Sequence, residues 1–176
     1  GWATTGEIRD ALMEFRDSGK FVISYSDYQL TQECYYLSTA ADKIFISPGS
    51  IVDFKGLSSE VMFFRNALEK LGIEVQVIRH GKFKGAVEPF ILDKLSDENR
   101  EQIKEYTGSI WKHVIEEIAS SRGIPVENLN NLADKLTGYM ADSALENGLV
   151  DGIIFRDQLL DTLRILSGIE KDKDLK

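Results

Sequence analysis

The feature that most constrains the fold is an alternation of short apolar runs with longer segments of helical spacing. The runs FVISYS (21–26), KIFISP (43–48) and SIVDFKGL (50–57) are rich in β-forming residues and are separated by turn residues and helix-like stretches. Strands that alternate with helices favour a parallel sheet, because each helix returns the chain to the same edge. The sequence therefore predicts an α/β fold built on a mainly parallel sheet.

The helix-like stretches have recognisable start and stop signals. Thr4 and Glu7 stand at capping-box spacing, and Gly72 and Gly123 suit the positions just after a helix. Helices are expected at 4–15, 28–41, 59–72, 96–123, 126–136, 142–148 and 157–168. Further strands are expected at 73–80 and 149–155, and the charged tail, 168–176, is expected to fray. The apolar residues expected on the inner face of the longest helix are Ile103, Tyr106, Ile110, Val114 and Ile118.

Composition excludes several classes of function. A net charge of −8 argues against a nucleic-acid surface, which needs clustered Lys and Arg. The only cysteine, Cys34, cannot form an intrachain disulfide, and His80 and His113 lack the spacing of zinc ligands, so no metal or other cofactor is expected. No apolar run is long enough to span a bilayer, so the chain as given is expected to be soluble.

Two lysines mark the segment GKFKGAVEPF (81–90), which comes after the strand expected at 73–80. A lysine in a glycine-flanked turn is usually a solvated surface residue. Functional residues of α/β sheets, however, gather where strands end, and both Lys82 and Lys84 stand there. Such a lysine could bind an anionic substrate, or act as a general base if burial lowered its pKa, which the charge of Glu88 would oppose. The chemistry of the residues alone leaves these alternatives open.

The segment GKFKGAVEPF closely resembles the G-x-[YF]-K-[SG]-A-x-E-P-F block of the signal peptide peptidase A (protease IV) family, in the ClpP/crotonase superfamily. Three further stretches, YYLSTAADKIFISPGSI, LEKLGIEVQVIRHGKFK and DSALENGLVDGI, are similar to other blocks of that family. The resemblance implies a ClpP/crotonase-like fold, a mainly parallel sheet with flanking helices. It also implies an activity: hydrolysis of cleaved signal peptides and other hydrophobic peptides by a Ser–Lys dyad.

Carried over residue by residue, the resemblance makes Lys84 the catalytic lysine and Lys82 an exposed lysine at a variable position. The chain departs from the family at the nucleophile. Single-unit members place a serine in an S-G-G-Y-Y turn, and this chain has Gln32 at that position, in Q-E-C-Y-Y. Thr31 and Ser38 are nearby hydroxyls, but neither is expected to point correctly from a helix.

A lysine without its serine is the pattern of the amino-terminal half of the family's long form, whose two tandem halves complete the dyad together. Residues 1–176 are therefore expected to be a single truncated domain of this fold, with the early strands missing and the serine supplied by a second half of the same chain. The chain alone is expected to be inactive. The family also implies assembly into homo-oligomers, a tetramer in the parent, and an anchor in the bacterial inner membrane with the catalytic body on its outer, periplasmic side. Substrate-binding residues remain unassigned.

Two other interpretations are open. The unit could be a non-catalytic assembly module in which the long helix mediates contacts and Lys84 is incidental. It could also be an acyl-CoA enzyme of the crotonase branch, although the lysine block does not belong to those enzymes. The pKa of Lys84 discriminates between base and incidental lysine, because a catalytic base has a lowered value.

Overall fold

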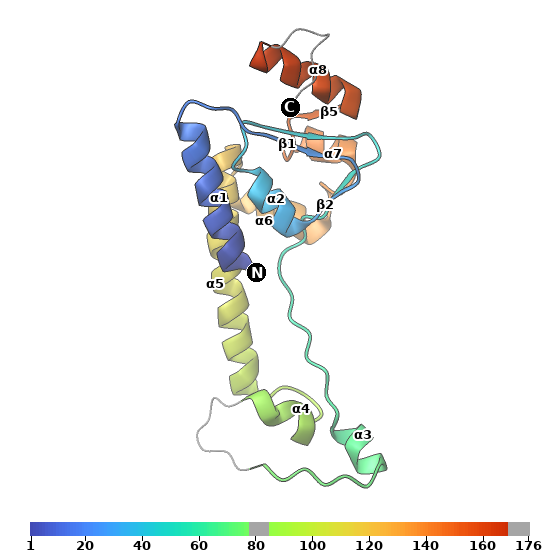
Figure 1. The fold of residues 1–176 in the computed structure, drawn as a ribbon. Helices are drawn as coiled ribbons and strands as arrows, with labels where there is room; N and C mark the ends of the chain where they lie inside the picture. Colours follow the sequence, from blue (N-terminus) through green and yellow to red (C-terminus); the bar gives the residue numbers. More distant parts are fainter. Residues whose placement is uncertain (78–84, 169–176) are drawn as a thin grey trace. The chain divides into compact units, whose positions relative to one another are not determined.

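The computed structural model describes residues 1–77 and 85–168. The chain divides into two compact units (Figure 1). Unit 1 consists of Gly1–Gly56 and the chain from Val114 on, and unit 2 is Leu57–His113. The predicted fold class, parallel sheets flanked by helices as in ClpP/crotonase-like proteins, is confirmed. The assignment of residues 1–176 to one domain of that fold stays a prediction.

A parallel three-stranded sheet forms the centre of unit 1. Its strands are β1 (Ile23–Ser26), β3 (Lys43–Ile46) and β5 (Gly152–Ile153), in the order β1-β3-β5. These strands confirm the predictions at 21–26, 43–48 and 149–155. Gly152 is paired with Phe45, and a Cβ atom there would lie 3.1 Å from the Phe45 ring, so the close approach of the two strands depends on glycine.

A second, two-stranded parallel sheet joins β2 (Gln29–Leu30) to β4 (Ile51–Val52). β4 confirms the short strand predicted at 50–57, whereas β2 falls inside the helix predicted at 28–41. The strand replaces the start of that helix because Leu30 becomes buried when it pairs with Val52. Ile51 also forms an antiparallel bridge to Met140.

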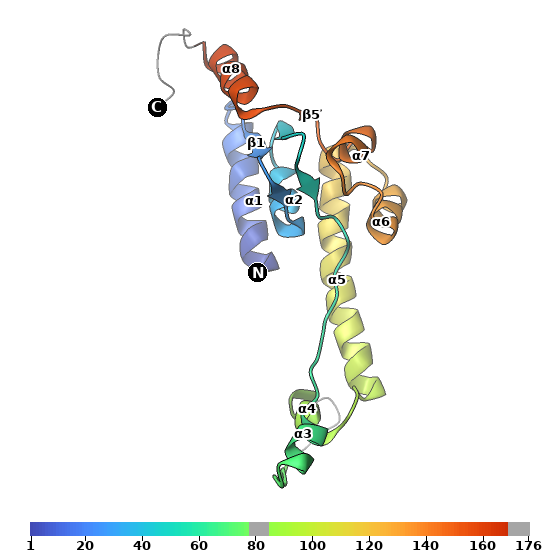
Figure 2. The same cartoon turned by 90° about the vertical axis from the view of Figure 1, so that its right-hand side faces the viewer.

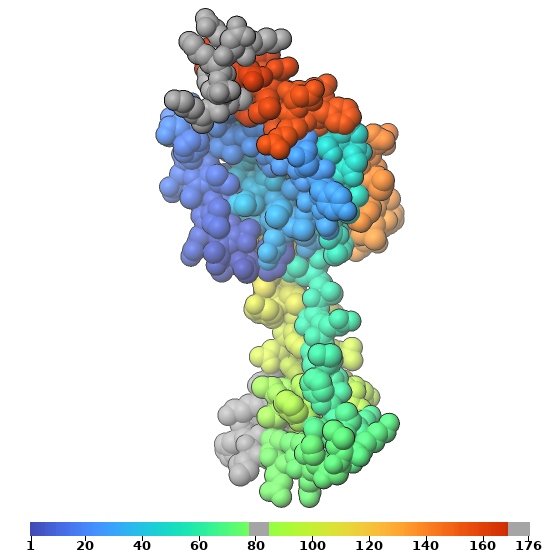
Figure 3. Space-filling model, turned by 45° about the vertical axis from the view of Figure 1, so that its right-hand side comes forward, coloured from blue at the N-terminus to red at the C-terminus, as the bar shows by residue number. Residues whose placement is uncertain are grey.

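Helices cover both sides of these strands. In Figure 2, α1 lies on one side of β1 and α2, and α6 and α7 lie on the other. The helices of unit 1, besides the carboxyl-terminal part of α5, are α1 (Trp2–Asp17), α2 (Gln32–Ser38), α6 (Val126–Lys135), α7 (Ala141–Glu146) and α8 (Arg156–Ser167). Figure 3 shows a face of this unit on which atoms of α8 (orange-red) border the blue amino-terminal segment. All of these helices are expected from the sequence, with shifted ends.

The start of α1 corrects one prediction. The helix begins at Trp2, so Thr4 lies inside its first turn and is not the N-cap. Trp2 packs against Tyr36, with 5.9 Å between the ring centroids. This tertiary contact favours extending the helix past the local capping signal.

Among the residues that the structure describes, the apolar core lies in unit 1. Its largest fully buried side chains come from α2, β3, β4, α5, α6 and the segment after α7: Tyr35, Tyr36, Ile44, Ile46, Val52, Val114, Ile115, Ile118, Leu129 and Leu149. Burial of such side chains supplies most of the stabilising free energy of a domain. The described part of unit 2 buries a single side chain, Glu88, and that side chain is polar.

Unit 2 contains short helices: α3 (Arg65–Lys70), a single 3₁₀ turn η1 (Gly85–Val87) and α4 (Glu88–Ile91). The strand predicted at 73–80 is wrong over its described residues, because 73–77 are irregular. A strand needs a paired neighbour, and no strand occurs in unit 2 as far as the structure describes it. The inference that the lysines come directly after a strand end therefore loses its support.

The long helix α5 spans Asp97–Arg122, and Gly123, with φ +66°, comes after its end as predicted. Its expected inner face is only partly correct. Val114 and Ile118, in unit 1, are buried, but Tyr106, in unit 2, is 65% exposed. Ile103 and Ile110, in the first part of this helix, are only half-buried, and the described part of unit 2 has no sheet to pack against them.

Candidate functional site

The lysine segment is described only from Gly85 onward. Lys84, the predicted catalytic residue, and Lys82, the predicted exposed lysine, lie outside the described residues. From Gly85 the chain forms a compact double turn, in which the 3₁₀ turn η1 leads directly into α4. Pro89 stands in the first turn of α4, where its missing N–H costs no helical hydrogen bond.

Glu88 fixes this double turn to the start of α5. Its carboxylate is 2% exposed and accepts hydrogen bonds from the Ser96 hydroxyl (2.5 Å), the Ser96 N–H (3.1 Å) and the Asn99 side-chain amide (3.1 Å). The Ser96 hydroxyl in turn accepts from the Asn99 N–H at 3.2 Å, as an N-cap does. The charge of Glu88 therefore lies at the positive end of the helix dipole and is matched by several donors.

Sequence reasoning treats Glu88 only as a charge that would oppose a lowered lysine pKa. The structure shows it as an anchor of the segment that begins at Gly85. The signal that could have found this role is the run S-D-E-N (96–99), a capping sequence eight positions after a carboxylate in the same motif.

Gly85, directly after the predicted catalytic lysine, packs against Asn99, which is hydrogen-bonded to Glu88. A Cβ atom at this position would lie 2.2 Å from the Asn99 side-chain nitrogen. Because Asn99 is held by Glu88, it cannot move away without losing that hydrogen bond. Glycine is therefore required here by close approach to a neighbouring side chain.

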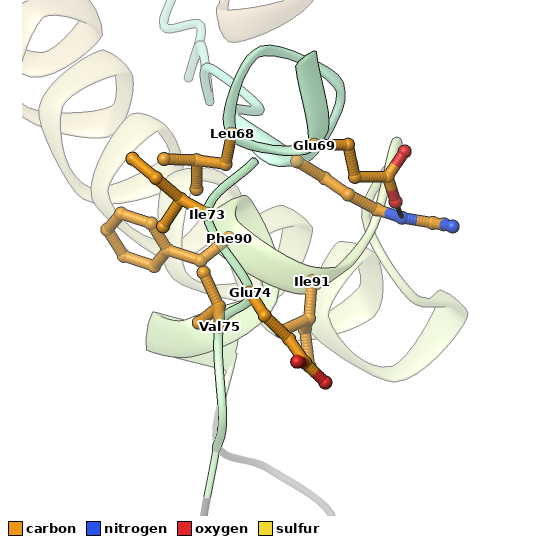
Figure 4. A pocket seen from close by; sticks show the side chains of 8 residues that line it. Leu68, Glu69, Ile73, Glu74, Val75, Phe90 and Ile91 are labelled. Atoms are coloured by element: carbon orange, nitrogen blue, oxygen red, sulfur yellow. Dashed lines mark hydrogen bonds and ion pairs between the residues drawn. The ribbon is translucent and has the colours of Figure 1, made fainter. Parts of the chain in front are cut away.

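A pocket of about 400 Å³ lies beside this segment within unit 2 (Figure 4). In Figure 4 the apolar side chains of Leu68, Ile73 and Phe90 gather on one side, and the carboxylates of Glu69 and Glu74 lie apart from them. The full lining is Arg65, Leu68, Glu69, Ile73, Glu74, Val75, Phe90 and Ile91. Apolar and charged side chains therefore share this pocket. Sequence reasoning assigns no substrate-binding residue, and Phe90 connects this pocket to the motif.

Gln32, which the resemblance aligns with the family's serine, is the first residue of α2 in unit 1. Its side chain is buried, and both ends of its amide form hydrogen bonds with backbone groups. The Nε2 atom donates to the Gly56 carbonyl (2.8 Å), and Oε1 accepts from the N–H groups of Lys55 and Gly56 (both 2.8 Å). Gln32 thus holds the loop at Lys55 and Gly56 to α2, and its amide is not a nucleophile.

The two nearby hydroxyls have structural roles. Thr31 is the N-cap of α2, and its hydroxyl oxygen accepts from the Cys34 N–H at 3.4 Å. The Ser38 hydroxyl donates to the Cys34 carbonyl (2.8 Å) and accepts from the Ser24 hydroxyl (2.7 Å). Both groups support the ends of one helix, as side-chain to backbone bonds of Ser and Thr commonly do.

The closing block DSALENGLVDGI supplies Asp151, which ties β3 to α5. Its carboxylate accepts from the Ile44 N–H (2.8 Å) and from Arg122 (2.9 Å), and Lys43 lies 3.6 Å away. Burial acts to raise the pKa of Asp151, but these hydrogen bonds and positive charges outweigh it and hold the pKa below the ordinary value. Arg122 also donates to the Gly148 carbonyl. The role of Asp151 is structural.

Comparison with known proteins decides the family. The model of peptidase family S49 matches residues 14–170, which is most of the chain. The chain belongs to peptidase family S49. The match covers parts of both units, because residues 14–170 include all of unit 2.

Several curated proteases are similar to this S49 chain. It is 31% identical over 175 residues to the chloroplastic serine protease SPPA of Arabidopsis thaliana, covering 99% of this chain and 26% of that protein. It is 35% identical over 153 residues to protease 4 of Salmonella typhi (83% of this chain, 25% of that protein). The match to protease 4 of Haemophilus influenzae is 31% over 172 residues (94% and 28%). The chain spans about a quarter of the length of these relatives.

The helices of the described residues can also be compared with the length and hydropathy that a bilayer requires. Within residues 1–77 and 85–168, none is both long and apolar enough to cross a membrane.

Proposed function

We propose that this chain is the lysine-bearing part of a serine peptidase that hydrolyses cleaved signal peptides and other extended hydrophobic peptides. The observation that carries the proposal is the S49 match over residues 14–170. It is supported by the relatives, which are named as proteases.

In this mechanism Lys84 is the general base. A neutral lysine takes the proton of a serine hydroxyl while the serine oxygen attacks the peptide carbonyl. The lysine then gives that proton to the leaving amine as the C–N bond breaks, and an ester links the peptide's acyl part to the serine. Water, deprotonated by the same lysine, hydrolyses the ester and frees the serine.

The serine comes from outside this chain. Gln32 holds the position at which single-unit relatives carry the nucleophile, and its amide is bonded to the backbone at Lys55 and Gly56. Thr31 and Ser38 are engaged at the ends of α2. The partner is therefore a serine-bearing second half of the same parent chain, and the chain alone is inactive. The parent forms homo-oligomers, and its catalytic body lies on the periplasmic side of a bacterial inner membrane.

Covalent labelling of the full-length parent by a fluorophosphonate tests the proposal. Replacing Lys84→Ala is expected to reduce the labelling rate by a factor of at least about 100, because the serine loses its base. The matched control is Lys82→Ala, which removes an equal charge two residues away and is expected to label like wild type. Unchanged labelling in a folded Lys84→Ala variant would show that Lys84 is not the base.

A second candidate function, an assembly module, is favoured by the surface of unit 2. Met62, Leu71 and Ile73 are exposed there, and unit 2 buries no apolar side chain among its described residues. Exposed apolar surface of this kind is typical of interfaces. If unit 2 is an assembly module, Lys84 of the parent has an ordinary lysine pKa. Wild type and Lys84→Ala are then labelled by the fluorophosphonate at the same rate.

A further inference from the structure

The loop at Lys55 and Gly56 presents an unusual set of backbone groups to one side chain. Two successive N–H groups, of Lys55 and Gly56, point at a single oxygen, Oε1 of Gln32, each at 2.8 Å. The Gly56 carbonyl accepts from the Nε2 atom of the same amide, also at 2.8 Å. Every one of these groups is backbone, so the site does not depend on the side chain of Lys55.

The backbone conformation at Gly56 and the pairing of β2 with β4 explain this arrangement. Gly56 has φ +83°, a left-handed conformation that favours glycine, and turned backbone of this kind can aim consecutive N–H groups at one acceptor. The parallel pairing of β2 with β4 continues into a hydrogen bond from the Asp53 N–H to the Leu30 carbonyl (2.9 Å). This pairing brings the loop alongside the first turn of α2.

The position of the amide is equally well defined. Gln32 is only 8% exposed and belongs to the first turn of α2, which Thr31 caps. Two acceptor contacts and one donor contact define the plane of a primary amide. A carboxylate could accept from both N–H groups, but it could not donate to the Gly56 carbonyl. The site therefore selects an amide over an anion.

We propose that Lys55 and Gly56 form a backbone binding site for one primary amide group, that Gln32 is its built-in ligand, and that a small primary amide enters the site when the Gln32 side chain is removed. In the native chain the site is closed, so it binds no substrate carbonyl. It fixes the point at which the chain leaves unit 1 for unit 2. This inference stands on the geometry of unit 1 alone and is independent of the proposed peptidase activity.

Chemical rescue of Gln32→Ala tests the site, with acetamide as the probe. The variant is expected to melt below wild type. Acetamide should raise its melting temperature saturably, by roughly 2–4 °C, because a ligand of the folded state alone stabilises that state. The backbone amide resonances of Lys55 and Gly56 should shift in the same titration. Acetate at equal concentration should do neither.

The matched control is Gln29→Ala, which removes an exposed glutamine from the adjacent strand. Neither it nor wild type is expected to respond to acetamide. An effect on Gln32→Ala no larger than on these two proteins would overturn the proposal.

A measurement on wild type covers the case in which Gln32→Ala does not fold. Scalar coupling across the hydrogen bonds should connect the backbone nitrogens of Lys55 and Gly56 to the side-chain carbonyl carbon of Gln32. Both N–H groups should exchange slowly with solvent. Fast exchange of both, with no coupling, would refute the assignment of Gln32 as the ligand.

Discussion

Single residues hold unit 1 together through contacts between elements that are distant in sequence. Arg9, on α1, is 3% exposed and lies over the Tyr36 ring of α2, with 5.1 Å from its guanidinium carbon to the ring centroid. It pairs with Glu117 of α5 (3.4 Å) and donates to Ser121 (2.6 Å) and Thr39 (3.3 Å). The Tyr36 hydroxyl also donates to Glu117. One buried cation thus connects three helices.

Removing this cation is expected to be costly. Arg9→Met keeps an apolar stem but loses the ion pair with Glu117 and the hydrogen bonds to Ser121 and Thr39, so the free energy of unfolding should fall by about 2–3 kcal/mol. Urea unfolding followed by circular dichroism measures it. Arg100→Met, an exposed arginine on α5, serves as the control and should change the free energy by less than about 0.5 kcal/mol. Equal effects for the two variants would contradict the structural role of Arg9.

Asp151 makes a prediction about pH. Its pKa in the folded chain lies below the ordinary 3.8, so its contribution to stability is fully present at neutral pH, above the unfolded pKa. The contribution is lost as the pH falls through the lowered folded pKa. Asp151→Asn should therefore be less stable than wild type at pH 7, by about 1–3 kcal/mol, and the difference should shrink on acidification below about pH 4. A difference that stays constant from pH 7 to about pH 2.5, measured by urea unfolding, would contradict this.

At the scale of elements, hydrogen bonds join the double turn of η1 and α4 to the start of α5. Glu88 belongs to α4, whereas Ser96 and Asn99 belong to the start of α5, and the hydrogen bonds between them centre on the buried carboxylate. The glycine at position 85 packs on the same cluster. The geometry of the motif therefore depends on the capping of a neighbouring helix.

Glu88→Gln is expected to loosen this pair of elements. The new NH₂ group would face donors from Ser96 or Asn99, which should lower the local free energy of opening by about 1–3 kcal/mol. Hydrogen exchange over residues 85–100 should speed up accordingly, with little change in unit 1. Glu101→Gln, at an exposed position of α5, is the control. If Glu88→Gln leaves the hydrogen exchange of residues 85–100 unchanged, the Glu88 carboxylate does not hold the double turn to α5.

At the scale of the whole molecule, the two units differ in what stabilises them. Among the described residues the apolar core belongs to unit 1. Unit 2 has short helices, the first part of α5, the hydrogen bonds of Glu88 and exposed ion pairs such as Arg65 with Glu69 at 2.9 Å. Exposed pairs contribute little free energy. Unit 2 is therefore the less stable part of this chain taken alone.

Hydrogen exchange of the isolated chain should show this difference directly. Residues 57–77 and 85–113 should exchange faster than the strands of unit 1, by a factor of at least about 10, because little buried surface opposes local opening. If a second half of the parent covers the exposed side chains of unit 2, the same residues should exchange more slowly in the full-length protein. Equal protection of both units in the isolated chain would contradict the first expectation.

The sequence by itself determined the α/β class, strands β1, β3 and β5, and the extent of α5, because these depend on local composition, periodicity and the glycine after the helix. It also led to the family, through the block at 81–90, a resemblance that the S49 match confirms.

Only the tertiary structure decided the roles of Gln32 and Arg9, and the irregular backbone at 73–77. The partners of Gln32 lie 23 and 24 positions away in the chain, and those of Arg9 as many as 112 positions away. No local pattern specifies which distant groups a buried polar side chain will meet. A strand, likewise, forms only where the fold brings another strand beside it, so the apolar run at 73–77 could not by itself fix its own structure.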